Sequence, residues 1–297
     1  MDRAVSTESN RIYTAEEFEA LSESQRKGLK LTLSCLGCGD VAWFKSATKP
    51  GAKVRRIAHF NSHHHGEECE FRTSYFLVDD EANSGKTTVE QVPVVAEYLV
   101  NLDSKIGGAI TDIALEPIPN EGFVVPPKPS GGAIGKGAGV AYETHLSKTL
   151  RQILSYLKRF PDFRTSDKKV VLYSESGQLK VNGAIKDLAV NFEDVDETMV
   201  DQYKLFWGVI VNAENEFQNN GIWLNSNRSK RGLSIKIYED IRDKFLQAFK
   251  IEELEALEGA HVLVAGKMHY SGRNNKPIVY CALPNFITIQ KYREVTN

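Results

Sequence analysis

The chain lacks three features that would narrow its class at once: a cysteine-rich framework, a long apolar run and a large net charge. Four cysteines in 297 residues are too few for a disulfide-stapled fold, and we expect a reducing, cytoplasmic setting. No apolar run approaches the roughly 18 residues of a membrane span, and the first residues lack a signal peptide's apolar core. A formal net charge of −2 gives no overall attraction to polyanions. We therefore expect an ordinary folded protein with no membrane partner.

Metal-binding residue types gather near the N-terminus. Cys35 and Cys38 form a Cys-x-x-Cys pair, which can direct two thiolates at one tetrahedral centre. The segment from His59 to Cys69 is the part of the chain that offers further donors of this kind. We expect a structural Zn²⁺ site, because four protein ligands leave no open position for water. The alternative is a redox Cys-x-x-Cys, but that motif belongs to a strand-to-helix turn of a βαβ unit.

The fourth zinc ligand has two candidates. We predict Cys35, Cys38, His59 and Cys69 as the ligands, since thiolate is a strong zinc donor. His63 is the alternate, and in place of Cys69 it would complete a Cys2His2 site with His-x3-His spacing. The remaining histidines of this segment are expected to be exposed polar residues.

The pattern of the chain predicts an α+β protein with an N-terminal zinc-stapled α/β module over residues 1–116. A Pro/Gly-rich linker or long loop is expected over 117–141, because proline stiffens and glycine loosens the chain. A helix plus short strands should follow over 142–200, with apolar residues near 3.6 spacing placing the helix at 142–160. Near the start, Thr14 followed by Glu17 predicts a capping box.

Residues 201–297 have the clearest order of elements. The order strand, strand, strand, helix, strand, strand is that of an OB-fold, a five-stranded barrel with a helix between its third and fourth strands. We therefore expect an OB-like β-barrel here. The strands are predicted over 205–211, 221–224, 233–238, 260–265 and 278–282, and the helix over 239–249.

Bases and aromatic side chains gather where an OB-fold binds its ligand, across strands two and three and between two loops. Cations neutralise phosphate, and flat side chains stack on unpaired bases at about 1–3 kcal/mol each. We expect a groove for nucleic acid, single-stranded DNA first and RNA as the alternative. Its candidate residues are Trp223, Arg228, Lys230, Arg231, Lys267, His269, Tyr270, Arg273 and Lys276.

The cysteine and histidine pattern, with His59-Phe60-Asn61-Ser62-His63 between Cys38 and Cys69, resembles the zinc-binding head of CoiA-like competence proteins. Glu143-Thr144-His145 resembles, in shortened form, the motif that opens the helix of that family's nuclease-like domain. The resemblance implies a zinc cofactor and a place in bacterial or mobile-element DNA processing.

The sequence thus predicts a non-catalytic, nucleic-acid-binding component of a larger DNA-processing machine, with other protein subunits as partners. No catalytic residue is assigned, because Gly177 stands where a PD-(D/E)xK nuclease needs its lysine. The alternative is a metal-dependent nuclease related to CoiA-like proteins, using Glu143 with Asp187 or Glu175. A third hypothesis is a zinc-containing scaffold that binds other proteins only.

Overall fold

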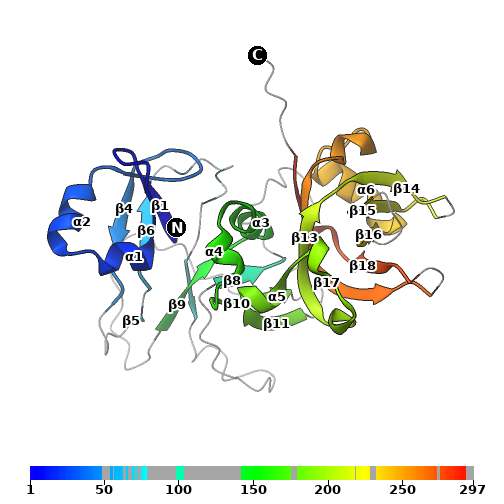
Figure 1. Cartoon of the computed structure of the whole chain (residues 1–297), viewed down its shortest axis with the longest axis horizontal. Helices are drawn as coiled ribbons and strands as arrows, with labels where there is room; N and C mark the ends of the chain where they lie inside the picture. Colours follow the sequence, from blue (N-terminus) through cyan, green and yellow to red (C-terminus); the bar gives the residue numbers. More distant parts are fainter. Residues whose placement is uncertain are drawn as a thin grey trace, which may run out of the picture. The chain divides into compact units, whose positions relative to one another are not determined.

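The computed structural model divides the chain into two compact units of mixed α+β structure, the fold class that the sequence predicts (Figure 1). The first unit comprises Met1–Val94 and Asp112–Ser147, and the second comprises Val95–Thr111 and Lys148–Asn297. The expected linker over 117–141 lies outside the described residues. The structure describes residues 1–48, 54–55, 57–62, 65, 69, 71, 75–78, 98–103, 142–174, 179–217, 219–227, 232–272 and 275–291. Within these ranges, no helix is long and apolar enough to cross a membrane.

The first unit is built on short strands. They are β1 (Arg3–Ser6), β2 (Ile12–Thr14), β3 (Leu33–Ser34), β4 (Ala42–Lys45), β5 (Val54–Arg55), β6 (His59–Ser62), β7 (Tyr75–Val78) and β9 (Tyr142–Ser147). β1 lies between β2 and β3, and β4 pairs with β6, all antiparallel. β9 pairs with β5 in parallel and with β7 in antiparallel orientation.

Two short helices of the first unit each begin at a capping box. At α1 (Ala15–Ala20), Oγ1 of Thr14 accepts from the backbone N–H of Glu17 at 3.1 Å, and the Glu17 carboxylate accepts from the Thr14 N–H at 2.8 Å. A second capping box, headed by Ser22, opens α2 (Glu23–Leu29). Each box satisfies two N–H groups that a helix otherwise leaves without partners. The capping box predicted at Thr14 is confirmed.

Phe18 on α1 anchors the core of the first unit. Its ring centre lies 4.9 Å from that of Phe44 on β4 and 5.4 Å from that of Phe60 on β6. The N-terminus is attached at the same place, since the α-amino group of Met1 donates to the carbonyl oxygen of Phe60 at 2.7 Å. The packing holds β4 and β6 together, and the cysteine and histidine segments adjoin these two strands.

The second unit begins with a small sheet and its covering helices. β8 (Tyr98–Asn101) lies parallel to β10 (Lys169–Ser174), which pairs with β11 (Leu179–Ala184) in antiparallel orientation. The helices are α3 (Leu150–Arg159), α4 (Pro161–Arg164) and α5 (Ile185–Leu188). The helix predicted over 142–160 is correct only in its second part, because Thr149 caps α3 and residues 142–147 form β9.

The rest of the second unit is one large sheet with a single longer helix. The strands are β12 (Ala189–Asn191), β13 (Tyr203–Val209), β14 (Asn212–Asn215), β15 (Ile222–Asn225), β16 (Ser234–Ile237), β17 (His261–Tyr270), β18 (Pro277–Cys281) and β19 (Ile287–Gln290), and α6 (Glu239–Ala248) follows β16. Their hydrogen-bonded order is β12-β13-β17-β18-β16-β15-β14, with β19 also on β17. Short 3₁₀ turns lie at Phe192–Asp194, Glu197–Met199, Leu254–Leu257 and Pro284–Phe286. The predicted strands and helix correspond to β13, β15, β16, α6, β17 and β18, but β14 is an additional strand between the first two of them.

The chain changes pairing partner between β13 and β14. The N–H of Ile210 donates to the carbonyl of Ala260, at the start of β17, and the N–H of Val211 donates to that of Asn225 on β15. In the hydrogen-bonded order β13-β17-β18-β16-β15-β14, the first and last strands are β13 and β14. These two strands follow one another directly in the sequence. No closed barrel is detected among the described strands.

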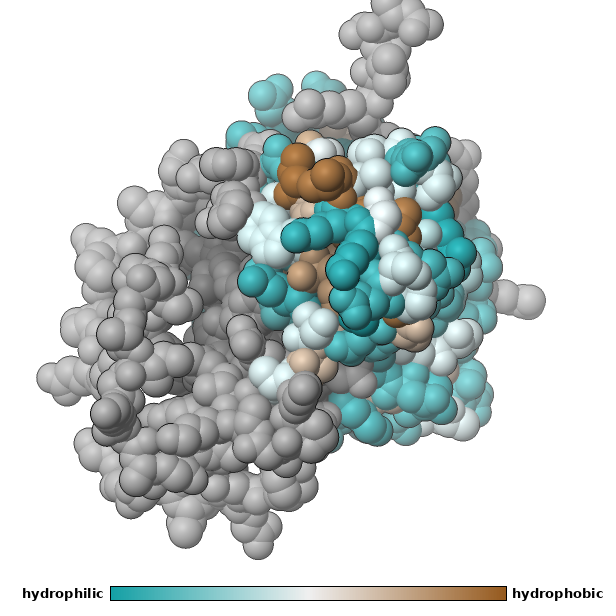
Figure 2. Space-filling model, turned by 90° about the vertical axis from the view of Figure 1, so that its left-hand side faces the viewer, coloured by the Kyte–Doolittle hydropathy of each residue, from teal (hydrophilic) through white to brown (hydrophobic). Residues whose placement is uncertain are grey.

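At β15 and β16 the large sheet has an apolar inner face and a partly exposed outer face, whereas the middle of β13 and of β17 is buried on both faces. Along β15, Ile222 and Leu224 are buried while Trp223 between them is half-buried. Along β16, Ile235 and Ile237 are buried while Lys236 is half-buried. Because successive strand residues point to opposite faces, this alternation assigns the buried set to the core. Figure 2 faces the first unit instead, and its coloured surface is mostly hydrophilic, with hydrophobic residues in small groups.

Candidate functional site

Cys35 and Cys38 lie on a tight turn between β3 and β4. The N–H of Cys35 donates to the carbonyl of Asp40 at 2.8 Å, and the N–H of Gly39 donates back to the carbonyl of Cys35 at 3.0 Å. Gly39 has φ +73°, a left-handed conformation that glycine adopts without steric cost. The turn is thus fixed by its own backbone hydrogen bonds.

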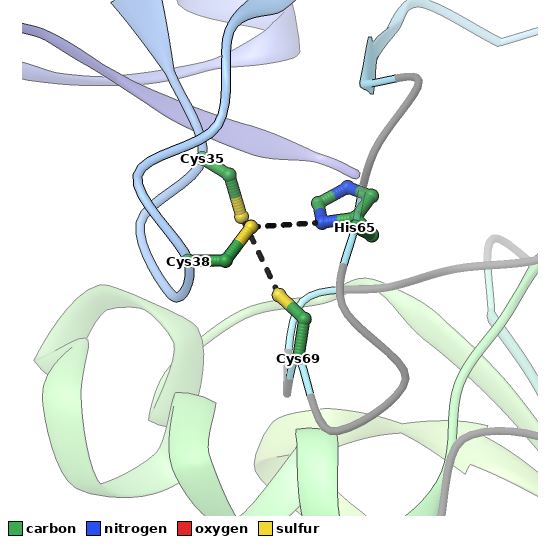
Figure 3. Close-up of side chains that lie close together, drawn as sticks. All are labelled: Cys35, Cys38, His65 and Cys69. Atoms are coloured by element: carbon green, nitrogen blue, oxygen red, sulfur yellow. Dashed lines mark hydrogen bonds between the residues drawn. The ribbon is translucent and has the colours of Figure 1, made fainter.

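Four metal-binding side chains converge at this turn: Cys35, Cys38, His65 and Cys69 (Figure 3). Their donor atoms all lie within 4.8 Å of one another. Sγ of Cys35 lies 3.6 Å from Sγ of Cys69, and Sγ of Cys38 lies 3.4 Å from Nδ1 of His65. Zinc–ligand bonds of about 2.0–2.3 Å in a tetrahedron put neighbouring donors about 3.3–3.8 Å apart. The two shortest contacts have this spacing, so the group could hold a metal ion such as zinc.

The cluster is buried on one side and open on the other. Cys35 and Cys69 are buried, His65 is half-buried and Cys38 is exposed. A hydrogen bond from the Cys35 thiol lowers the pKa of Cys69 to about 3. The pKa of Cys35 is raised, mainly by this hydrogen bond and secondly by burial. Burial also raises the pKa of Cys38. Since thiolate is the form that binds metal, one sulfur of the buried pair is already favoured in that form.

Three of the predicted ligands, Cys35, Cys38 and Cys69, come together, but the histidine was assigned wrongly. His59 is buried within β6, and its Nδ1 lies 2.8 Å from the carbonyl oxygen of Ile57. The structure does not bring it to the cluster, because its place in β6 holds it in register opposite Lys45. His63 lies outside the described residues.

His65 is the ligand that sequence reasoning missed. It was expected to be an exposed polar residue, yet it stands four residues before Cys69. A His-x3-Cys pair has the short spacing with which one segment supplies two donors to a zinc ion, as the Cys-x-x-Cys pair does on the other segment. That spacing was the available signal.

No protein-family model matches this chain, and no curated protein matches it significantly. The resemblance to CoiA-like proteins therefore stays a prediction. Of the nuclease candidates, Glu143 lies in β9 and Asp187 is exposed on α5, while Glu175 is outside the described residues. Within the part of the chain that the structure describes, the Cys3His group is the one set of Cys, His, Asp or Glu donors close enough for a metal ion.

Five of the nine predicted nucleic-acid residues lie in the part of the chain that the structure describes. Trp223 lies half-buried on the outer face of β15, and Lys267 is exposed on β17. His269 and Tyr270 end β17, and Lys276 precedes β18. The other four lie outside the described residues: Arg228, Lys230, Arg231 and Arg273.

Tyr270, one of the predicted nucleic-acid residues, stands in acidic surroundings. Desolvation raises its pKa, and the carboxylates of Glu197 and Asp196 raise it further. A negative potential at this ring disfavours an approaching phosphate. The Tyr270 ring is therefore not favoured as a contact for phosphate.

The outer face carries a row of contacting side chains that the sequence analysis did not assemble. We call Trp223, Lys236, Tyr238, Tyr280 and His269 the outer-face ladder. The rings of Tyr238 and Tyr280 are stacked, with centres 5.7 Å apart and planes at 15°. Nζ of Lys236 lies 5.1 Å from the centre of the Trp223 ring and 5.3 Å from that of Tyr238. The His269 ring is 5.9 Å from that of Tyr280.

The ladder follows from strand register. Trp223 pairs with Lys236, and Lys236 pairs with Tyr280 in the parallel neighbour. Tyr238 stands two residues after Lys236, so it points to the same face. The lysine therefore lies between aromatic side chains of adjacent strands.

Proposed function

We propose that this protein is a non-catalytic nucleic-acid-binding protein, with single-stranded DNA as its first ligand, and that a structural Zn²⁺ holds its N-terminal unit together. The observation that carries the proposal is the outer-face ladder, which gathers aromatic rings on one sheet face. Rings on a sheet face are platforms for unpaired bases, because every base has a flat π-surface. Its biological setting is a larger DNA-processing assembly with other protein subunits.

The choice of zinc rests on donor chemistry. Three thiolates and one imidazole form a set that zinc takes in closed, four-coordinate structural sites. Four protein donors leave no position for a reacting water, so the role is structural rather than catalytic. The metal would tie the turn at Cys35 and Cys38 to the segment that holds His65 and Cys69.

Metal analysis of the purified protein tests the zinc site. We expect about one zinc per chain, and loss of that zinc in the double variant Cys35→Ser/Cys38→Ser. Cys281→Ala is the matched control, since Cys281 is buried on β18 and does not belong to the cluster. Full zinc retention in the double variant would overturn the assignment.

We further propose that β13 to β18 form an OB-like barrel in which β13 and β14 act as one bent strand. The partner change at Ile210 and Val211 supports this, because a shared first strand closes such a barrel. The parallel pairing of β16 with β18, with α6 between β16 and β17 in sequence, supports it as well. In this arrangement strands two and three are β15 and β16, which carry Trp223 and Lys236.

Fluorescence anisotropy with labelled oligonucleotides tests nucleic-acid binding. OB-folds occupy about 4–16 nucleotides, so strands of about 15 nucleotides suffice. We expect saturable binding of single-stranded DNA, weaker binding of the same sequence as duplex, and no cleavage when Mg²⁺ is added. Absence of binding to both single-stranded DNA and single-stranded RNA at about 50 mM salt would overturn the proposal.

A further inference from the structure

The cations of the outer-face ladder are already paired with carboxylates of the protein. Nζ of Lys236 lies 2.6 Å from Oε1 of Glu216, with only 13% and 16% of the two side chains exposed. Nδ1 of His269 lies 2.9 Å from Oδ1 of Asp201. A phosphate that drew Lys236 away would leave a carboxylate without its counter-charge in a mostly buried place, which is costly. Lys236 is therefore not available for a nucleic-acid backbone at low cost.

Lys276, next to the ladder, is held in the same way. Its ammonium donates to Oδ1 of Asn225 at 3.0 Å, and Nδ2 of Asn225 donates to the Glu214 carboxylate at 3.2 Å. Burial also lowers the pKa of Lys276. Among the described basic side chains that were predicted to line the groove, that of Lys267 is the exposed one. The described face thus offers several rings but little positive charge.

A cavity beside Tyr238 is likewise lined by more carboxylates than basic side chains. It is a shallow, open depression with a volume of about 480 Å³. Tyr238 is 41% exposed, and Phe217, on the chain segment after β14, is 99% exposed. Lys236 is the one basic residue of the lining, so a phosphate would meet the carboxylates of Glu239 and Asp240 there, whereas an uncharged ring would meet the ring of Tyr238. The lining residues are Glu216, Asn219, Lys236, Tyr238, Glu239 and Asp240.

We infer that the outer-face ladder holds its ligand by stacking on unpaired bases and not by neutralising phosphates. The inference rests on the proposed function and gives it a ligand class: single-stranded nucleic acid recognised through its bases, with Tyr238 and Tyr280 as the main platforms. Lys267 supplies the one described phosphate contact. The affinity of this face for a single strand should therefore depend weakly on salt concentration and strongly on the presence of nucleobases in the strand.

Salt dependence is the first measurement. For single strands, log Kobs falls with log[salt] at a slope of about −0.7 for each phosphate neutralised. In a variant with Arg228, Lys230, Arg231 and Arg273 replaced by Gln, we expect a slope of about −0.7 for a 15-nucleotide DNA strand, and a slope near zero when Lys267→Gln is added. A strand held by four phosphates would give about −2.8. A steep slope of that size would overturn the inference while leaving the proposed function standing.

Removing bases is the second measurement and needs no variant. An abasic strand of the same length keeps its phosphates, and we expect its affinity to fall at least about 10-fold, since each stacked base contributes about 5- to 150-fold. Tyr238→Leu and Tyr280→Leu should each weaken binding about 10-fold, while Tyr238→Phe, which keeps the ring face, should bind normally. Equal affinity for the abasic strand, or for both leucine variants, would contradict base stacking. Failure of every strand to bind would instead overturn the proposed function itself.

Discussion

Sγ of Cys38 lies 3.4 Å from Nδ1 of His65, a residue 27 positions further along the chain. The turn between β3 and β4 supplies the cysteine, and the segment after β6 supplies the histidine. A metal ion at this point would therefore link the turn directly to the segment after β6. Ligand binding of this kind adds directly to the free energy of folding.

The two histidines can be told apart by their variants. His65→Ala should lose most of the bound metal and lower the melting temperature, because three donors remain. His59→Ala should keep the metal but destabilise the protein by about 1–3 kcal/mol, because it removes a buried, hydrogen-bonded ring. Metal content by mass spectrometry and thermal unfolding measure both effects. The reverse pattern, with metal lost only in His59→Ala, would restore the original assignment.

Gly37 should be intolerant of any side chain, although it is exposed. A Cβ here would stand 2.7 Å from Cδ2 of Phe71 and 3.1 Å from Sγ of Cys69. Gly37→Ala must therefore displace Phe71 and shift Cys69, and crowding of this kind costs about 1–3 kcal/mol. We expect metal affinity to fall about 10-fold in a competition titration with a chelator. Gly28→Ala on α2 is the control, since nothing lies within 4 Å of its new Cβ.

The Lys236–Glu216 pair should matter for stability as well as for the ladder. Lys236→Met leaves Glu216 mostly buried without its counter-charge, and its Oε2 already has no hydrogen-bond partner among the described residues. We expect a loss of about 2–4 kcal/mol in urea unfolding. Glu216→Leu added to it should recover part of that loss, because the unpaired carboxylate is gone.

An exposed pair provides the comparison for that measurement. Lys186 and Asp167 also meet at 2.6 Å, but 46% and 82% of their side chains are exposed. Solvent screens such pairs, so Lys186→Met should change stability little. Similar losses for Lys186→Met and Lys236→Met would contradict the role given to burial.

His261 should make the protein less stable in mild acid. Burial lowers the pKa of His261 in the fold, and the positive charge of Lys158 lowers it further. The unfolded chain, with an ordinary pKa of about 6.5, therefore takes up this proton first as pH falls. The contribution of His261 is fully present above about pH 6.5 and is lost on acidification through the lower pKa of the fold. Urea unfolding between about pH 7 and pH 5 should show a shallower decline for His261→Gln, and an identical decline would exclude this role.

Local features of the sequence predicted local structure well. Thr14 and Glu17 form their capping box because both partners lie within one turn of helix. The helix over 239–249 and the strands around it are found close to their predicted places. The error at 142–160 is also local: Thr149 and Gln152 form a capping box that starts α3, although the helical spacing of apolar residues extends back to Leu146.

The sequence by itself determined the cysteine turn and the alternation of apolar and polar residues, because each depends on residues only a few positions apart. Tertiary structure alone decided that His65, and not His59, meets the cysteines, since pairing with β4 holds His59 within β6. It alone decided which basic side chains contact carboxylates, since Glu216 and Asp201 reach Lys236 and His269 from 20 or more residues away in the sequence. Charge pairs and metal ligands between distant segments depend on where folding places them, and the spacing of residue types does not reveal it.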